Sequence, residues 1–117
     1  MKRSLTREER LRRKNDFDAV FAAGRRRGCK GARLVYRKND LDYNRFAVCP
    51  VRKYGNAVER NRVKRICREL FRNTKSRIKP GFDIVLIVYP GRDDYKVREE
   101  QFSFLLKEEE LFPFDIN

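Results

Sequence analysis

Side chains that bind phosphate crowd one short stretch of this sequence, NAVERNRVKRICRELFR, from Asn56 to Arg72. Six of its seventeen residues are arginine or lysine. A guanidinium group offers a planar fork of N–H donors that matches phosphate oxygens, and an ammonium group offers a point charge. The stretch therefore favours binding of a polyanion, although a run of charge on a helix is more often only a solvated face.

A helix must present these cations, and the stretch carries its own start signal. Asn56 suits the N-cap, and Glu59 three residues later completes a capping box, so we expect a helix from about residue 57 to about residue 75. Apolar residues recur at helical spacing and form one stripe for packing on a sheet: Val63, Ile66, Cys67, Leu70 and Phe71.

The cations of this helix are not spread evenly around it. At about 100° per residue, one arc opposite the stripe holds Asn61, Lys64, Arg65, Arg68, Arg72 and Lys75. Arg60 and Arg62 flank the stripe near the start of the helix. Like charges at this spacing cost a few tenths of a kcal/mol per pair. Bound phosphates would remove that repulsion, so we interpret the arc as a nucleic-acid surface.

The charge of the whole chain supports this interpretation. The 117 residues carry a formal net charge of +13. Residues 1–92 hold 27 bases against nine acids, whereas residues 93–117 hold three bases against eight acids. Such a body attracts nucleic acid first and an anionic membrane second. The length predicts a single domain, residues 1–117.

The same composition excludes several kinds of active site. The chain has no histidine, and its three cysteines match no metal-binding spacing. Its aspartates form no paired constellation of the kind that a two-metal nuclease needs. We therefore predict neither a catalytic residue nor a metal site in the polypeptide. No apolar run reaches the length of a membrane span, and the acids near the N-terminus argue against a transit peptide, so we expect a cytoplasmic protein.

The remaining elements form an α/β (α+β) pattern. After a basic arm at about residues 1–14 comes a short helix that ends at Gly24, and RRRGCKG then looks like a basic loop. We expect two antiparallel, neighbouring strands at 31–38 and 44–51, a doubly buried strand in FDIVLIVY, and a last helix at about 95–112. Pro50 suits an edge strand.

Three aromatic residues lie close to basic segments. Phe17 and Phe21 are one helical turn apart, and Tyr36 lies on one face of the first expected strand. Core packing is the usual role of such aromatics. Single-stranded nucleic acid, however, binds where cations track the phosphates and aromatic rings stack on the bases. The residues alone leave both roles open.

Several ordered segments resemble one known family. GNAVERNRVKRICRELF resembles the signature of the bacterial ribonuclease P protein subunit, in which an Arg-Asn-Arg core precedes Lys-Arg. DFDAVFAAG, LVYRKN, RKYGNAV and GFDIVLI also stand at the spacing of that family. The resemblance runs from about Leu11 to Leu106.

The resemblance implies a function for this chain. In that family a large RNA subunit, with bound magnesium, removes the 5′ leader of precursor tRNA, and the small protein binds both the RNA subunit and the leader. The resemblance implies that the residues that contact RNA are Lys53, Arg60, Asn61, Arg62, Lys64, Arg65 and Arg68. The leader falls in a cleft between the first helix and the sheet, lined by Phe17, Phe21 and Tyr36.

The implied fold is a two-layer sandwich in which a long basic helix and flanking helices pack on a small mixed sheet of about four strands. It includes a left-handed crossover between parallel strands, against the general preference. Pro50, in CPVRK, departs from the family pattern and removes a backbone donor near Lys53.

Three other functions compete with this one. A ribosomal or translation-associated structural protein would share the charge and architecture but would not promote RNA cleavage. A DNA-binding module would need a helix–turn–helix pair, and the stretch before Asn56 predicts a strand instead. A membrane-surface helix is disfavoured because the sheet needs the apolar stripe.

Overall fold

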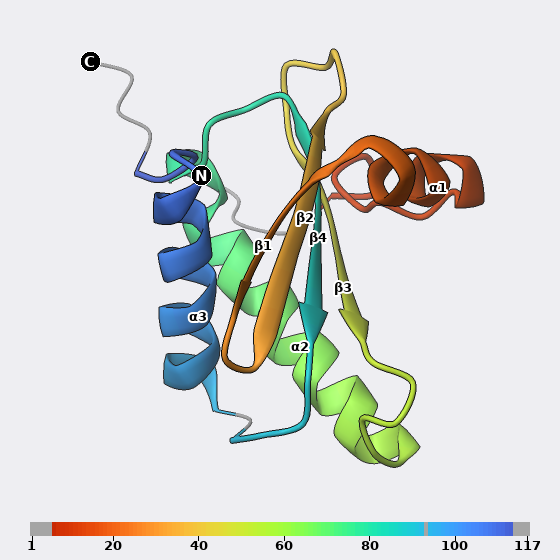
Figure 1. Cartoon of the computed structure of the whole chain (residues 1–117), viewed down its shortest axis with the longest axis vertical. Coiled ribbons are helices and arrows are strands. Elements are labelled where there is room, and N and C mark those ends of the chain that lie inside the picture. The colour runs from red at the N-terminus through yellow and green to blue at the C-terminus, as the bar shows by residue number, and fades with distance from the viewer. Residues whose placement is uncertain (1–5, 93, 114–117) are drawn as a thin grey trace.

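The computed structural model describes residues 6–92 and 94–113. These residues form three α-helices, a single 3-10 turn and one four-stranded sheet. The elements in chain order are α1 (Lys14–Ala23), β1 (Arg25–Cys29), β2 (Ala32–Lys38), β3 (Arg45–Pro50), α2 (Ala57–Thr74), η1 (Lys75–Arg77), β4 (Phe82–Val88) and α3 (Tyr95–Glu108). Figure 1 shows α1 on one side of the sheet and α2 with α3 on the other.

Helix α2 begins where the sequence predicts. The side chain of Asn56 accepts a hydrogen bond from the backbone N–H of Glu59 at 2.9 Å, and the Glu59 carboxylate accepts one from the N–H of Asn56 at 3.0 Å. This reciprocal pair satisfies two N–H groups that a helix start otherwise leaves open. The predicted stripe is buried at Val63, Cys67, Leu70 and Phe71, and Ile66 is half-buried.

The strand order is β1-β2-β4-β3, so the strands predicted at 31–38 and 44–51, which are β2 and β3, run antiparallel as expected but are not neighbours. Strand β4 lies between them, antiparallel to β2 and parallel to β3. Ile84 of β4 accordingly faces Tyr36 on one side and Phe46 on the other. The short β2–β3 connection sets their opposite directions but not their adjacency. The most apolar strand takes the central place because it alone gains from burial on both faces.

The segment predicted as a basic loop is in fact a strand. Strand β1 pairs antiparallel with β2, and Arg25 lies opposite Tyr36. Its side chains are almost all exposed, so the sequence shows no alternation of apolar and polar residues there. Backbone hydrogen bonds to β2, rather than burial of side chains, hold this edge strand.

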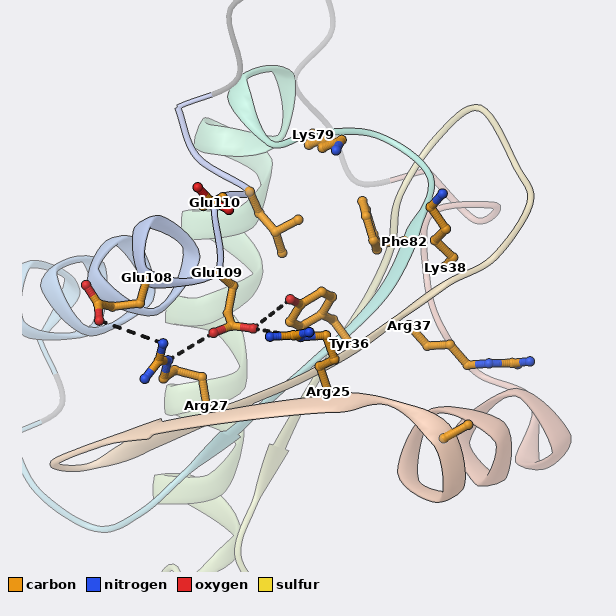
Figure 2. Close-up of a pocket in the computed structure, with 12 residues that line it drawn as sticks. Arg25, Arg27, Tyr36, Arg37, Lys38, Lys79, Phe82, Glu108, Glu109 and Glu110 are labelled. Atoms are coloured by element: carbon orange, nitrogen blue, oxygen red, sulfur yellow. Dashed lines mark hydrogen bonds and ion pairs between the residues drawn. The ribbon is translucent and has the colours of Figure 1, made fainter.

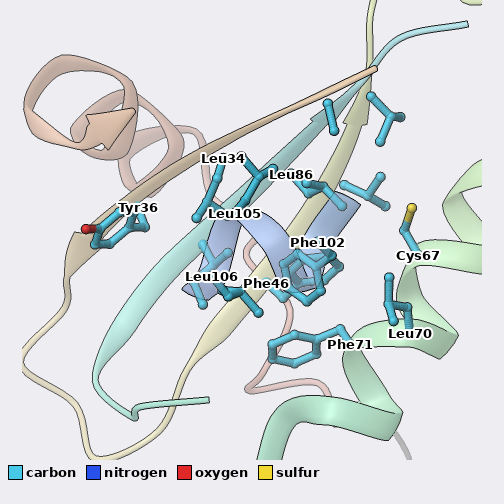
Figure 3. Close-up of a cluster of buried hydrophobic side chains, with 14 of the residues drawn as sticks. Leu34, Tyr36, Phe46, Cys67, Leu70, Phe71, Leu86, Phe102, Leu105 and Leu106 are labelled. Carbon is cyan, nitrogen blue, oxygen red and sulfur yellow. The ribbon is translucent and has the colours of Figure 1, made fainter. Parts of the chain in front are cut away.

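Side chains from the two faces of the sheet form separate cores. The larger core lies under α2 and α3, where the rings of Phe46 and Phe71 stack with centroids 4.5 Å apart and Phe102 meets Phe46 edge-on (Figure 3). The smaller core, under α1, contains Leu11, Val20, Val35 and Val85. The four-stranded mixed sheet with its helices confirms the predicted α+β fold. Helix α2 connects the parallel strands β3 and β4, and the hand of this crossover stays a prediction.

The described part of the N-terminal arm lies against the sheet. The N–H of Leu11 donates to the carbonyl of Phe46 at 3.0 Å, and the N–H of Phe46 donates to the carbonyl of Glu9 at 2.8 Å. Leu11 is buried beneath this bridge. Residues 9–11 therefore extend the edge of β3, and α1 starts at Lys14. Residues 1–5 of the predicted arm lie outside the described residues.

Candidate nucleic-acid interface

The outer surface of α2 carries cations that are free to bind a ligand. We call Asn61, Arg62, Lys64, Arg65 and Arg68 the cationic face. All are exposed except Lys64, which is half-buried. Within residues 6–92 and 94–113, the four cations make no hydrogen bond or ion pair through their side chains. The buried stripe on the opposite side fixes the helix, so this face is held in place without using its charges.

The cationic face is shorter than the sequence predicts. Arg72 pairs with Glu69 at 2.6 Å, and Lys75 pairs with Glu9 of the arm at 2.9 Å. Both cations belong to the predicted arc. Carboxylates therefore neutralise the C-terminal end of the arc, and the cations of the cationic face, which have no carboxylate partner in the described chain, lie at residues 62–68.

Arg60, also predicted to bind RNA, holds a loop of the protein. Its guanidinium donates to the carbonyl of Val51 at 2.8 Å and makes longer contacts with the carbonyls of Arg52 and Pro50 at 3.4 and 3.5 Å. These bonds tie the start of α2 to the connection that follows β3. Lys53 is exposed on that connection, so Arg60 fixes the backbone that presents it.

The structure separates the three predicted aromatic residues. Phe17 and Phe21 are half-buried on α1, with ring centroids 6.4 Å apart and planes inclined by 16°. Tyr36 lies on the opposite face of the sheet, with only 6% of the residue exposed, and its ring meets Phe82 edge-on at 5.6 Å. Successive side chains of a strand alternate between faces, and Val35 rather than Tyr36 points toward α1.

Other residues accompany Phe17 and Phe21 in place of Tyr36. Ala47 and Cys49 of β3 and Ile87 of β4 are half-buried and pack against the smaller core beside α1. Burial raises the pKa of the Cys49 thiol, and nearby Lys64 offsets this only in part, so the thiol is neutral and contributes apolar surface. The alternation of β3, with Phe46 and Val48 facing the larger core, was the signal that could have identified these residues.

A second group of cations lies at the opposite edge of the sheet. The Glu109 carboxylate accepts hydrogen bonds from Arg25 Nε at 3.2 Å, Arg27 Nε at 3.0 Å and the Tyr36 hydroxyl at 2.7 Å (Figure 2). We call Arg25, Arg27 and Glu109 the arginine clamp. It lies in a pocket of about 500 Å³ at the end of α3. More than eighty residues separate the arginines from Glu109, so no local pattern could have predicted it.

The clamp changes the titration of its members. Burial by itself would raise the pKa of Glu109, but hydrogen bonds from Tyr36, Arg25 and Arg27 outweigh it and lower that pKa below the ordinary value. Burial and the neighbouring Glu109 carboxylate together raise the pKa of Tyr36 to about 12. Glu109 is therefore charged and Tyr36 neutral at neutral pH.

The described acids do not assemble into a metal site. No group of three or more histidine, cysteine, aspartate or glutamate side chains stands close enough to hold a metal ion within the described ranges. Asp83 instead pairs with Arg45, at 2.7 Å to each carboxylate oxygen, and Asp16 pairs with the same arginine at 3.2 Å. None of the helices in the described part of the chain combines the length and hydrophobicity that crossing a membrane requires.

Comparison with known proteins identifies the family. The family model described as Ribonuclease P matches residues 5–110, almost the whole chain. The chain belongs to the bacterial ribonuclease P protein family. The ribonuclease P protein component of Thermotoga maritima is 39% identical over 112 residues, covering 90% of this chain and 96% of that protein. That of Syntrophus aciditrophicus is 41% identical over 86 residues, covering 74% and 72%.

Solved structures of ribonuclease P proteins share the fold. The protein from Thermotoga maritima superposes with a TM-score of 0.77 at 38% identity, covering 86% of this chain and 96% of that one. The protein from Staphylococcus aureus gives the same TM-score at 26% identity, covering 89% and 97%. These matches confirm the resemblance predicted from the sequence. Membership of the family makes this chain a component of ribonuclease P, a nuclease that processes tRNA.

Proposed function

We propose that this protein is the non-catalytic subunit of ribonuclease P. It binds the catalytic RNA and the 5′ leader of precursor tRNA, and it promotes magnesium-dependent removal of the leader. The observation that carries the proposal is the cationic face of α2, whose four cations have no side-chain partner in the described residues. A helix that keeps such a face open gains most when phosphates cover it.

Binding of the RNA subunit follows from this geometry. Arg62, Arg65 and Arg68 are exposed, so each can meet phosphate oxygens without first breaking an ion pair within the described chain. Each phosphate that a cation neutralises releases condensed counterions, which makes the affinity fall as salt rises. The exposed Lys53, on the connection that Arg60 fixes, extends this surface beyond the start of α2.

The leader is bound beside α1. Phe17 and Phe21 offer partly exposed rings next to the half-buried Ala47, Cys49 and Ile87. Stacking of bases on such rings depends little on base identity and is worth about 1–3 kcal/mol per base. A stacking surface can therefore accept the different leaders of many precursor tRNAs. Tyr36 is buried on the other face and takes no part in this surface.

Magnesium belongs to the RNA subunit in this proposal. The carboxylates of Asp16, Asp83, Glu9 and Glu109 are each engaged by arginine or lysine, so they do not suit a shared cation site. The polypeptide contributes cations that lower the magnesium needed to fold and dock crowded RNA. The place of action is the cytoplasm, with tRNA precursors as substrates.

Reconstitution tests the proposal. The purified protein, ribonuclease P RNA and precursor tRNA are mixed at graded magnesium, and release of the 5′ leader is followed. We expect no cleavage by the protein alone and cleavage at lower magnesium when the protein joins the RNA. The variant Arg62→Ala/Arg65→Ala should need more magnesium than the wild type while melting at the same temperature. Cleavage by protein free of RNA, or no shift in the magnesium requirement, would overturn the proposal.

A further inference from the structure

The arginine clamp places a buried negative charge at an unfavourable position. Glu109 is the C-cap residue of α3, where the helix dipole disfavours an anion. Its side chain is nevertheless only 4% exposed. Three hydrogen bonds, from Arg25, Arg27 and Tyr36, compensate for this burial. The carboxylate is thus fixed from three directions and cannot reorient without breaking them.

The two arginines keep their outer ends available. Both bind Glu109 through Nε, so that carboxylate does not use their terminal Nη groups. The side chain of Arg25 is 76% exposed and that of Arg27 is 43% exposed. Arg27 Nη2 also forms a long ion pair with the exposed carboxylate of Glu108, at 3.9 Å, beyond hydrogen-bond distance (Figure 2). One buried carboxylate therefore holds two exposed guanidinium groups.

The surroundings of the clamp carry more positive charge than Glu109 requires. Arg37, Lys38 and Lys79 line the same pocket and, among the residues that the structure describes, their side chains form no ion pair or hydrogen bond (Figure 2). Glu108 and Glu110 are the other acids of the lining, which therefore contains five cations and three carboxylates. The excess suits an anion that reaches the pocket from solvent.

We propose that Arg25 and Arg27 form a phosphate-binding site for RNA, and that Glu109 is the residue that positions them. A phosphate group accepts hydrogen bonds from the exposed Nη groups, while Glu109 keeps both guanidinium planes in the orientation that presents them. Tyr36 acts through Glu109, because its hydroxyl fixes the same carboxylate. The site rests on the RNA-binding function proposed above and lies at β1, across the sheet from the β3 edge where α2 packs.

The asymmetry of burial distinguishes this role from that of a simple tie between α3 and β1. A tie would gain most from arginines that are buried along with their partner, since exposed ion pairs contribute little. Here the carboxylate is buried and the guanidinium groups face solvent. Long side chains on an exposed edge strand lose much conformational entropy when they bind a ligand. Because Glu109 already orders the two arginines in the unbound protein, less entropy is lost on binding.

The decisive variant is Glu109→Gln, because the two explanations predict opposite signs. Removing a negative charge from an RNA-binding protein ordinarily raises its affinity for RNA. If Glu109 positions the arginines, the neutral amide should instead weaken RNA binding by about three- to tenfold, since charge-assisted bonds hold the geometry. Glu100→Gln is the matched control: it makes the same charge change at an exposed position of α3. It should leave affinity equal to or slightly above that of the wild type.

Substitutions that retain charge test the site independently of the stability of the carboxylate variant. Arg25→Lys and Arg27→Lys keep the net charge but lose the planar fork, so each should weaken binding by about two- to fivefold. Arg92→Lys, at an exposed position outside the pocket, is the control and should bind like the wild type. Thermal melts check that each variant is folded.

Two binding measurements identify the source of the phosphate. One titrates the RNA subunit alone, and the other titrates precursor and mature tRNA against the assembled holoenzyme. A loss confined to the RNA subunit assigns the site to it, and a loss confined to precursor tRNA assigns it to the leader. The proposed site is wrong if Glu109→Gln is folded and binds both RNAs at least as tightly as Glu100→Gln. It is also wrong if Arg25→Lys and Arg27→Lys bind like Arg92→Lys. The RNA-binding function proposed above is tested separately: it is contradicted if Arg62→Ala also binds the RNA subunit as tightly as the wild type.

Discussion

The cationic face of α2 and the arginine clamp present positive charge in two different ways. On α2 the backbone does the positioning: the buried stripe fixes the helix, and its exposed cations need no carboxylate partner. At the clamp the backbone is an edge strand with almost no buried side chain, and a buried carboxylate positions the arginines instead. A rigid helix can therefore leave its charges open, whereas an exposed strand needs an internal anion to order them.

The largest expected effect is a difference in stability between substitutions on the buried side and on the exposed side of α2. Leu70→Ala removes a fully buried side chain from the larger core and should lower the free energy of unfolding by about 2–5 kcal/mol. Arg65→Ala, five residues earlier on the exposed side, should change it by less than about 0.5 kcal/mol. Urea denaturation measures both. An Arg65 variant that unfolds as readily as the Leu70 variant would show that the cationic face also supports the fold.

The next effect concerns substrate selection beside α1. Phe21→Ala should weaken precursor tRNA binding to the holoenzyme by roughly five- to hundredfold, because one stacking contact is worth about 1–3 kcal/mol. Mature tRNA, which lacks the leader, should bind almost unchanged. Phe102→Leu, at a ring buried in the larger core and outside both proposed RNA surfaces, is the control and should not discriminate between the two tRNAs. Equal losses for both tRNAs with Phe21→Ala would mean that the ring serves packing alone.

A smaller effect should distinguish the roles of two neighbouring arginines of α2, Arg60 and Arg62. Arg60→Ala removes one of the two donors to the carbonyl of Val51, which also accepts from the N–H of Tyr54, and should lower the free energy of unfolding by about 1 kcal/mol. Arg62→Ala should leave stability unchanged but reduce the slope of log affinity against log salt for the RNA subunit by about 0.7–0.9. Salt titrations and melts of both variants distinguish the roles. If Arg60→Ala lowered the slope as much as Arg62→Ala without loss of stability, Arg60 would be a direct RNA contact.

The smallest effect is a pH dependence at the clamp. The pKa of Tyr36 is raised to about 12 in the folded protein, so the unfolded chain loses this proton first as pH rises above about 10. The proton on Tyr36 should therefore add to the free energy of unfolding in full below about pH 10, and this contribution should disappear between about pH 10 and 12. By pH 11 the loss should be about 1 kcal/mol. The comparison is the difference in unfolding free energy between the wild type and Tyr36→Phe at pH 8 and pH 11. A difference that stays constant would refute the coupling.

Local patterns were enough to predict the helix that carries the cationic face. The Asn56 capping box, the apolar stripe and the arc of cations are all encoded within about twenty residues, and the structure reproduces the first two closely. The partners of Arg72 and Lys75 were harder to foresee. Glu69 lay within reach in sequence, but Glu9 is brought to Lys75 only by the bridge between the arm and β3.

Pairings between distant segments could not be predicted in the same way. Strand β1 has no apolar alternation, so only its partner β2 reveals it as a strand. The position of β4 between β2 and β3 depends on its burial on both faces, which no short connection encodes. Tyr36 was expected beside Phe17 and Phe21 but lies on the other face of the sheet, because strand alternation does not tell which helix covers a face. Its bond to Glu109 likewise followed only from the assembled sheet.

The bridge between Arg10 and Phe46 has a consequence for the solubility of the chain before it meets RNA. Open sheet edges invite pairing with other copies and hence aggregation. The arm covers the outer edge of β3 at Phe46, and further along that edge Pro50 has no N–H to offer an incoming strand. At the other end of the sheet, successive arginines on β1 repel an identical strand. Both edges are thereby protected from self-association, by a docked backbone on one side and by charge on the other.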